Sequence, residues 1–216
     1  MIRDFGTIDV LYLIAAARWT LLLTLVAFAG GAVMGALLAI LRVSPFAPLR
    51  LVATLFIQIV QGTPLLVWLF LFYFGLSIIG LPVNAWIAAT LAFSVYGGAF
   101  LGEIWRGALI AIPKTQWEAG AALGLSFLEQ MRYIIMPQAV RSAIPPTVGF
   151  LVQLIKNTSL AATIGFVELT REGQLTSAST YKPFAVYLTV AAIYFCLCFP
   201  LTQWSRSLER KLNVAR

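Results

Sequence analysis

Two charged residues inside an apolar stretch are the first candidates for chemistry in this sequence. Glu103 and Arg106 interrupt residues 85–110, which are otherwise apolar and long enough to cross a bilayer. A charge that faces lipid near the bilayer centre costs at least about 2.5 kcal/mol, so both side chains should face protein or a cavity. Glu103 could bind the ammonium group or a cationic side chain of a substrate. Alternatively, the two residues are three apart on a helix and could pair; we favour the substrate role for Glu103 and the pair for Arg106.

Neutral polar residues near predicted helix breaks form a second group of candidates. Their amide and hydroxyl groups could hydrogen-bond the charged ends of a small polar solute, as broken membrane helices do. The alternative is that they satisfy backbone groups freed at the breaks, and the sequence leaves both interpretations open. The residues of this possible substrate pathway are Gln61, Thr63, Gln153, Asn157, Thr158 and Ser159.

The residue types that are absent exclude several kinds of enzyme. The sequence contains no histidine, which removes most hydrolytic triads and histidine-ligated metal sites, and it contains no G-x-x-x-x-G-K-[ST] phosphate-binding loop. Cys196 and Cys198 are two residues apart, so on a helix they point to different faces and are expected to be unpaired. We therefore expect no catalytic residues, metal or cofactor in this chain, and an intramembrane enzyme is disfavoured.

The composition is that of an integral membrane protein. Of the 216 residues, 61% are hydrophobic and 11% are charged, whereas a soluble domain has about 25% charged residues. The formal net charge of +7 would suggest nucleic-acid binding in a soluble protein. In a membrane protein it is better explained by basic loops on the cytoplasmic side of the bilayer, so we expect no nucleic-acid partner.

The apolar runs predict one all-α membrane domain over residues 1–216 with five spans. Each run meets the requirement of about 20 apolar residues for a bilayer, and residues 1–17 read as an amphipathic entry. The second run is broken at Gly62-Thr63-Pro64. Small residues at positions 27, 31, 35 and 39 would let another helix approach closely, either within the chain or in a second subunit. The predicted spans are 19–41, 51–79, 85–110, 133–156 and 184–204.

Residues 113–137, which we call the knuckle, bring polar and charged residues between the third and fourth apolar runs. Thr115 and Glu118 fit a capping box that would open one short helix, and Ser126 and Glu129 fit a second. Gly124 lies between them, where a helix end requires the left-handed backbone that glycine adopts without a Cβ penalty. The pattern predicts a helix, a glycine turn and a second helix.

The distribution of basic residues predicts the orientation. Arg3, Arg18, Lys156, Arg171 and Lys182 fall on the side of the N-terminus, which leaves ten of the 15 Lys and Arg residues in the 42–50 turn, the knuckle region and the tail. The positive-inside rule then places the N-terminus outside and the knuckle and C-terminus in the cytoplasm.

Several motifs resemble those of a known family. The run E-A-G-A-A-L-G at 118–124, followed after twelve residues by P-Q-A, is similar to the EAA loop of permease subunits in ATP-binding-cassette (ABC) importers. G-T-P-L-L at 62–66, Y-G-G-A-F-L-G-E-I-W-R-G at 96–107 and K-N-T-S-L at 156–160 resemble the polar amino-acid permeases in particular. Two positions depart from the family pattern: Gly120 replaces the usual alanine, and Gln61 stands where arginine is common.

The resemblance implies a type I ABC importer permease fold and a set of partners. The EAA loop would act as a coupling helix on a separate ATPase dimer that binds ATP and Mg, through Glu118, Ala119, Gly120, Gly124 and Leu125. A second permease subunit, identical or homologous, would complete the pathway for a polar amino acid across the bacterial inner membrane.

The resemblance also implies a periplasmic substrate-binding protein. It would dock on the polar connection after the fourth span, through Glu168, Arg171 and Glu172, although such a charged stretch could instead be only a solvated surface. The rival to the importer is a stand-alone secondary transporter or channel for a small polar solute. It is disfavoured by the small number of spans, the lack of proton-relay residues and the knuckle.

Overall fold

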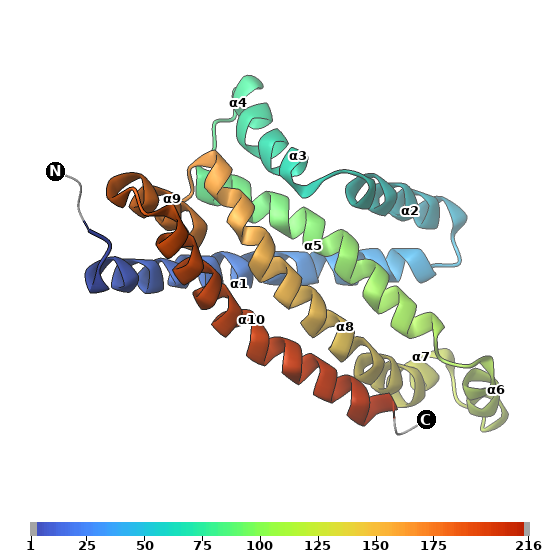
Figure 1. The fold of residues 1–216 in the computed structure, drawn as a ribbon. Coiled ribbons are helices and arrows are strands. Elements are labelled where there is room, and N and C mark those ends of the chain that lie inside the picture. Colours follow the sequence, from blue (N-terminus) through green and yellow to red (C-terminus); the bar gives the residue numbers. More distant parts are fainter. Residues whose placement is uncertain (1–3, 214–216) are drawn as a thin grey trace.

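The computed structural model describes residues 4–213, and within this range the chain is all-helical with no strand. Three helices are long and apolar enough to cross a membrane, and five spans result if each of two bent helix pairs counts as one. Figure 1 shows the helices arranged as an elongated bundle. The all-α fold class predicted from the sequence is confirmed.

The centre of the bundle is the contact between α1 (Thr7–Val43) and α5 (Ala85–Ile110). Gly31 lies against the backbone of Gly97 and Gly98, and Gly35 lies against Leu101 and Gly102. A Cβ on Gly31 would be 3.1 Å from the carbonyl carbon of Gly97. The small residues of the first span therefore serve packing within the chain, which is one of the two alternatives that the sequence left open.

The second apolar run is broken where the sequence predicted. It forms α2 (Ala47–Gly62), α3 (Leu65–Phe70), the π-helical turn η1 (Leu71–Gly75) and α4 (Leu76–Ile78). The two halves are bent by 100° around Thr63 and Pro64. Proline has no N–H and the residue before it avoids helical geometry, which explains why α2 cannot continue into α3.

The fourth apolar run changes helix type near Pro137 but continues through Pro145 and Pro146. After α7 (Phe127–Gln130) comes the π-helical turn η2 (Met131–Ile135), then α8 (Met136–Asn157), which contains Pro145 and Pro146, and the 3₁₀ helix η3 (Thr158–Ile164). The η2 turn ends two residues before Pro137, whose missing N–H leaves the regular i→i−4 ladder incomplete there.

The polar connection at 157–183 is more ordered than the sequence suggested. It folds into η3 and α9 (Leu169–Thr180), and α9 packs against α1 and α10 (Pro183–Asn213). Gly173 permits this packing, because a Cβ there would be 2.8 Å from a methyl group of Val190. The predicted last span, 184–204, is the first part of α10, which continues beyond Pro200 into the basic tail.

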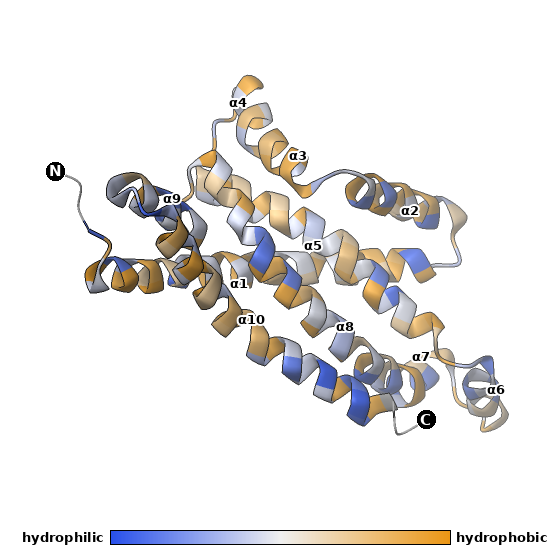
Figure 2. Cartoon of the chain, in the orientation of Figure 1, coloured by the Kyte–Doolittle hydropathy of each residue, from blue (hydrophilic) through white to orange (hydrophobic). Residues whose placement is uncertain are grey.

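The two ends of the bundle differ in composition. The beginnings of α1 and α10 lie with α9 at one end; the ends of α1, α5 and α10 lie with α6 (Lys114–Ala122) and α7 at the other, which we call the knuckle end (Figure 1). Hydrophilic residues gather on α6 and α7 and on the last turns of α10 (Figure 2). The α1 helix starts three turns earlier than the predicted span, so residues 7–17 belong to it.

The glycine contact makes a testable prediction for stability. Gly31→Ala should destabilise the chain by about 1–3 kcal/mol, because the added methyl group meets backbone atoms that cannot move aside. Gly107→Ala on α5 is the matched control, since nothing lies within 4 Å of its added Cβ. The thermal unfolding midpoints in detergent should fall for the first variant only. An equal midpoint for the two variants would contradict the close α1–α5 contact.

Candidate coupling site and pathway residues

The turn of the knuckle has the geometry that the sequence predicted. Gly124 has φ +75°. Its N–H donates to the carbonyl of Ala121 at 2.9 Å, and the N–H of Leu125 donates to the carbonyl of Gly120 at 3.1 Å. These two bonds are the Schellman motif that ends a helix with a left-handed residue. The prediction that Gly124 caps α6 is confirmed.

One of the two predicted capping boxes is present. The Ser126 hydroxyl accepts from the Glu129 N–H, and the Glu129 carboxylate accepts from the Ser126 N–H at 2.8 Å. Hydrogen bonds from the Ser126 hydroxyl and amide hold the pKa of Glu129 below its ordinary value. The prediction of a capping box at Thr115 and Glu118 is wrong. The α6 helix begins at Lys114 after Pro113, so Thr115 lies within the first turn and not at the cap position.

Gly120 and Ala119, which were both expected to contact the ATPase, lie in different environments. Gly120 is buried inside the knuckle, where a Cβ would be 2.9 Å from the Gln130 side chain. Gln130 in turn donates to the carbonyl of Leu125 at 2.8 Å and holds the turn closed. The small size of Gly120 therefore serves packing of α6 on α7 and η2, whereas Ala119 and Glu118 are exposed.

The knuckle also exposes large apolar side chains that our sequence analysis missed. Leu123, Phe127 and Leu128, which we call the apolar knuckle surface, have exposed fractions of 77%, 63% and 76%. Large exposed apolar side chains on an otherwise polar segment are typical of surfaces that contact another protein or the membrane. The signal in the sequence was the apolar residues on either side of the Gly124 turn, which we had treated only as helix positions.

The knuckle is firmly attached to two spans. Ile112, two residues after the end of α5, packs with Ile135 at the end of η2 and with Ala139 in the first turn of α8, and all three are buried. Trp117 of α6 packs on this cluster and stacks on Phe127 with ring centroids 5.7 Å apart. A displacement of the knuckle must therefore move the ends of both α5 and α8.

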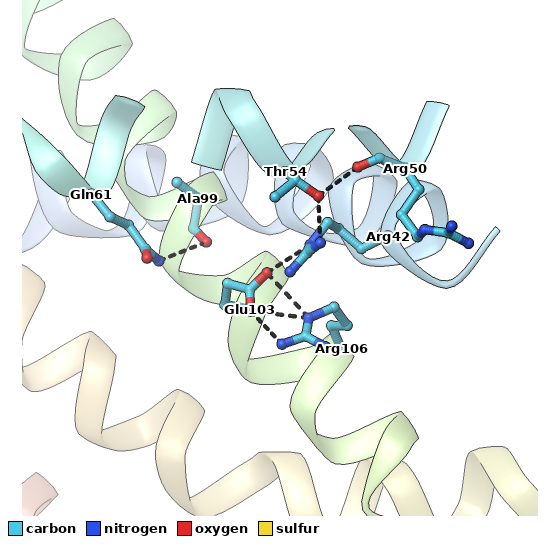
Figure 3. A network of polar contacts seen from close by, with 7 residues as sticks. All are labelled: Arg42, Arg50, Thr54, Gln61, Ala99, Glu103 and Arg106. Carbon is cyan, nitrogen blue, oxygen red and sulfur yellow. Dashed lines mark hydrogen bonds and ion pairs between the residues drawn. The ribbon is translucent and has the colours of Figure 1, made fainter. Parts of the chain in front are cut away.

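Glu103 belongs to a polar network that joins α1, α2 and α5 (Figure 3). Its Oε1 accepts from Nε of Arg42 at 2.9 Å, and its Oε2 accepts from Nη2 of Arg106 at 2.7 Å. Arg42 also donates to the hydroxyl of Thr54 on α2, which donates to the backbone carbonyl of Arg50. Both carboxylate oxygens of Glu103 are thus engaged within the chain.

This network changes the interpretation of the charged pair. The expected bond between Glu103 and Arg106 is present, and the structure favours the pairing alternative for both residues over a free substrate-binding carboxylate at Glu103. Arg42 is the member that sequence reasoning missed. It lies 61 residues before Glu103, so no helical spacing could connect them.

Most of the neutral pathway candidates bond to backbone carbonyls. Thr158 and Ser159 donate to the carbonyls of Ile155 and Lys156, and Thr63 donates to that of Ile59. Gln61 donates to the carbonyl of Ala99 on α5 at 3.3 Å (Figure 3). These contacts are those of the backbone-satisfying alternative, and they do not bring the residues into one site.

Gln153 and Asn157 are the two candidates that the structure brings together. The Gln153 amide donates to the Asn157 side chain at 3.1 Å. Gln153 lies one turn beyond Gly149 on the same face of α8, and both residues are exposed. An amide-bearing face on a membrane helix lines protein or an aqueous route.

Glu168 requires a correction. It is fully buried, accepts hydrogen bonds from the hydroxyls of Thr20 at 3.3 Å and Tyr194 at 2.8 Å, and caps α9 through the N–H of Arg171. A buried carboxylate that joins α1, α9 and α10 is not available on a surface for a partner. Arg171 and Glu172 are half-buried, and their docking role stays a prediction.

An all-helical membrane bundle with a polar helix face and an apolar knuckle surface has the features of a transport subunit that works with other proteins. The family model for the "binding-protein-dependent transport system inner membrane component" matches residues 31–214. The chain therefore belongs to this family, and it is a multi-pass protein of the inner membrane.

Individual relatives agree over almost the whole chain. One relative is the probable amino-acid ABC transporter permease protein YckA of Bacillus subtilis (strain 168), which is 38% identical to this chain. The match covers 93% of this chain and 88% of the relative. The chain is 36% identical, over 94% of its length and 93% of the relative, to the glutamine transport system permease protein GlnP of Escherichia coli (strain K12).

Solved structures show the same fold. A crystal structure of an amino acid ABC transporter with histidines superposes with a TM-score of 0.87 at 34% identity, over 92% of this chain and 93% of that one. An inward-facing MetNI methionine ABC transporter gives a TM-score of 0.76 at 22% identity, and the match covers 93% of this chain and 96% of that one. The fold is that of type I ABC importer permeases, as the sequence resemblance implied.

The Glu103 network makes the second prediction. Glu103→Gln leaves the two half-buried guanidinium groups without their counter-charge, and losing such a charged hydrogen bond costs roughly 1.5–3 kcal/mol. The unfolding midpoint in detergent should fall relative to Glu118→Gln, a control at an exposed carboxylate. If Glu103→Gln were as stable as the control yet lost transport, the carboxylate would act on substrate.

Proposed function

We propose that this chain is the permease subunit of an ABC importer that carries a polar amino acid across the inner membrane into the cell. The observation that carries the proposal is the knuckle: a rigid, capped helix pair that exposes apolar side chains and is fixed to two spans. The amino-acid substrate class is supported by the names of the relatives and of the similar structure.

The knuckle end faces the cytoplasm in this proposal, and the N-terminus faces the periplasm. The orientation is supported by the ten basic residues on the knuckle side, against five on the other. A partner ATPase dimer binds ATP and Mg there and receives the apolar knuckle surface together with Glu118. Closure of the ATPase dimer then moves α6, and the buried cluster around Ile135 passes the movement to α5 and α8.

A second permease subunit, identical or homologous, covers the polar face of α8. This face holds Gln153 and Asn157, which supply amide groups to a polar solute once the route is enclosed. At the opposite end of the bundle, a periplasmic binding protein delivers the substrate near α9, where Arg171 and Glu172 are its candidate contacts. The chain itself contributes binding and movement, and hydrolysis belongs to the ATPase.

Gly124→Val tests the coupling role of the knuckle. Valine at positive φ strains the backbone by about 1–2 kcal/mol and should open the turn. Gly80→Val is the matched control, because Gly80 also has positive φ (+83°) and open space around it but lies in the turn between α4 and α5. ATP-driven uptake in proteoliposomes with the ATPase and binding protein should fall several-fold for Gly124→Val only. Equal uptake by the two variants would contradict the proposed coupling role of the knuckle.

Leu128→Asp tests the docking surface itself. A P-loop ATPase should co-purify with the tagged wild-type chain in mild detergent, and the charge placed on the apolar knuckle surface should reduce its recovery at least several-fold. Leu81→Asp is the control, an exposed leucine in the turn before α5. Transport of solute by a chain purified alone, without ATP, would instead support a secondary transporter.

A further inference from the structure

A cavity with both polar and apolar walls opens at the knuckle end of the bundle, and its lining includes none of the predicted pathway residues. It has a volume of about 890 Å³ and lies between the start of α6, the first half of α8 and the last turns of α10. Small-molecule sites occupy about 300–1,000 Å³. Figure 2 shows hydrophilic residues along this part of α10.

Two opposite charges from different helices line the cavity. Arg141 comes from α8 and Glu209 comes from α10. Neither side chain forms an ion pair or a hydrogen bond with any residue that the structure describes. In contrast, Glu103 and Arg42, near the same end, satisfy each other within the chain. An unpaired cation and anion around one cavity are free to bind a ligand that carries both charges.

Two prolines free backbone hydrogen-bond acceptors at residues that line the cavity. In a regular helix the carbonyls of Arg141 and Ser142 would accept from the N–H groups of residues 145 and 146. Both positions are proline, which has no N–H, so these helix bonds cannot form. Such freed carbonyls are tolerated in a membrane helix where they line a polar cavity. Arg141 and Ser142 both line this one.

We infer that this cavity binds the zwitterionic head of an amino acid at the knuckle end. The guanidinium of Arg141 pairs with the α-carboxylate, and a planar guanidinium can do so through two parallel hydrogen bonds. The carboxylate of Glu209 and the freed carbonyls accept from the α-ammonium group. The site recognises only the groups that all amino acids share. This inference rests on the proposed amino-acid substrate and orientation, which make the cavity an exit site on the cytoplasmic side.

The position of Arg141 on α8 connects the site to the rest of the proposed route. Gly149 also lines the cavity, and Gln153 follows it one turn later on the same exposed face. Arg141 and Gln153 are twelve residues apart, or about 18 Å along a helix. A solute that leaves Gln153 therefore meets the cavity next on its way to the knuckle end.

Equilibrium binding of L-glutamine to the nucleotide-free permease–ATPase complex in detergent tests the inference. Arg141→Gln and Glu209→Gln should each weaken binding by about tenfold or more, since each removes one charge-assisted contact. Arg206→Gln is the control, because this basic residue of α10 does not line the cavity. Unchanged affinity in the two cavity variants, or no binding to the wild type, overturns the inference.

Two analogues separate recognition of the head group from a structural effect. N-acetyl-L-glutamine lacks the ammonium charge, and L-glutaminamide lacks the carboxylate. Glu209→Gln should abolish the preference for L-glutamine over the first analogue and retain it over the second, and Arg141→Gln should do the reverse. A misfolded variant would lose both preferences, and size-exclusion chromatography with retained ATPase identifies it.

Uptake assays keep this inference distinct from the proposed function. If the wild-type complex takes up radiolabelled amino acids with ATP but the cavity variants bind L-glutamine normally, only the exit site is wrong. If no amino acid in a panel is taken up, the proposed substrate class fails instead. If the cavity variants lose the ATPase while L-glutamine binding is unchanged, the cavity is a protein contact and the inference is overturned.

Discussion

The close approach of α1 and α5 is the contact on which the rest of the structure depends. In lipid, apolar surface gives helices little reason to associate, so packing requires backbones that come near each other. Gly31 and Gly35 on α1 meet Gly97, Gly98 and Gly102 on α5 without intervening side chains. With α1 fixed in this way, two of its side-chain contacts fall at opposite ends of the bundle: Arg42 reaches Glu103 at the knuckle end, and Thr20 reaches Glu168 near α9.

The sequence predicted elements well where local chemistry sets them. The limits of α5 match because Asn84 caps its first turn through a side-chain bond to the N–H of Ile87, and the apolar run ends at Ile110. Gly124 and the Ser126–Glu129 box also obey local rules. The Thr115–Glu118 box failed because Pro113 had already started the helix. The beginning of α1 was missed because its cap is a glycine with Asp9 as the bonding partner, a weaker signal than serine or threonine.

Residues whose environment is set by distant segments could not be assigned from spacing. Glu168 reads as a surface charge because its neighbours in sequence are polar, yet Thr20 and Tyr194 come from helices 148 residues before and 26 residues after it. Glu103 reads as a free carboxylate because Arg42 is remote in the chain. Gly120 reads as part of a docking face because its packing partner, Gln130, lies across the turn on α7. In each case the tertiary contact decides between alternatives that local sequence leaves open.

In the proposed mechanism, the α8 helix must meet two requirements that normally conflict. Its first turns must be stiff, because they would receive the movement of the knuckle through Ile135 and Ala139. The helix must also offer polar groups to a solute, and Pro145 and Pro146 free the carbonyls of Arg141 and Ser142 at the expense of two helix bonds. The Ser205 hydroxyl of α10 donates to the carbonyl of Pro145 at 2.9 Å, which joins α10 to α8 at the prolines. This contact lies where α8 lacks two of its own helix bonds, so in the proposed mechanism a displacement of α8 would act on α10 as well.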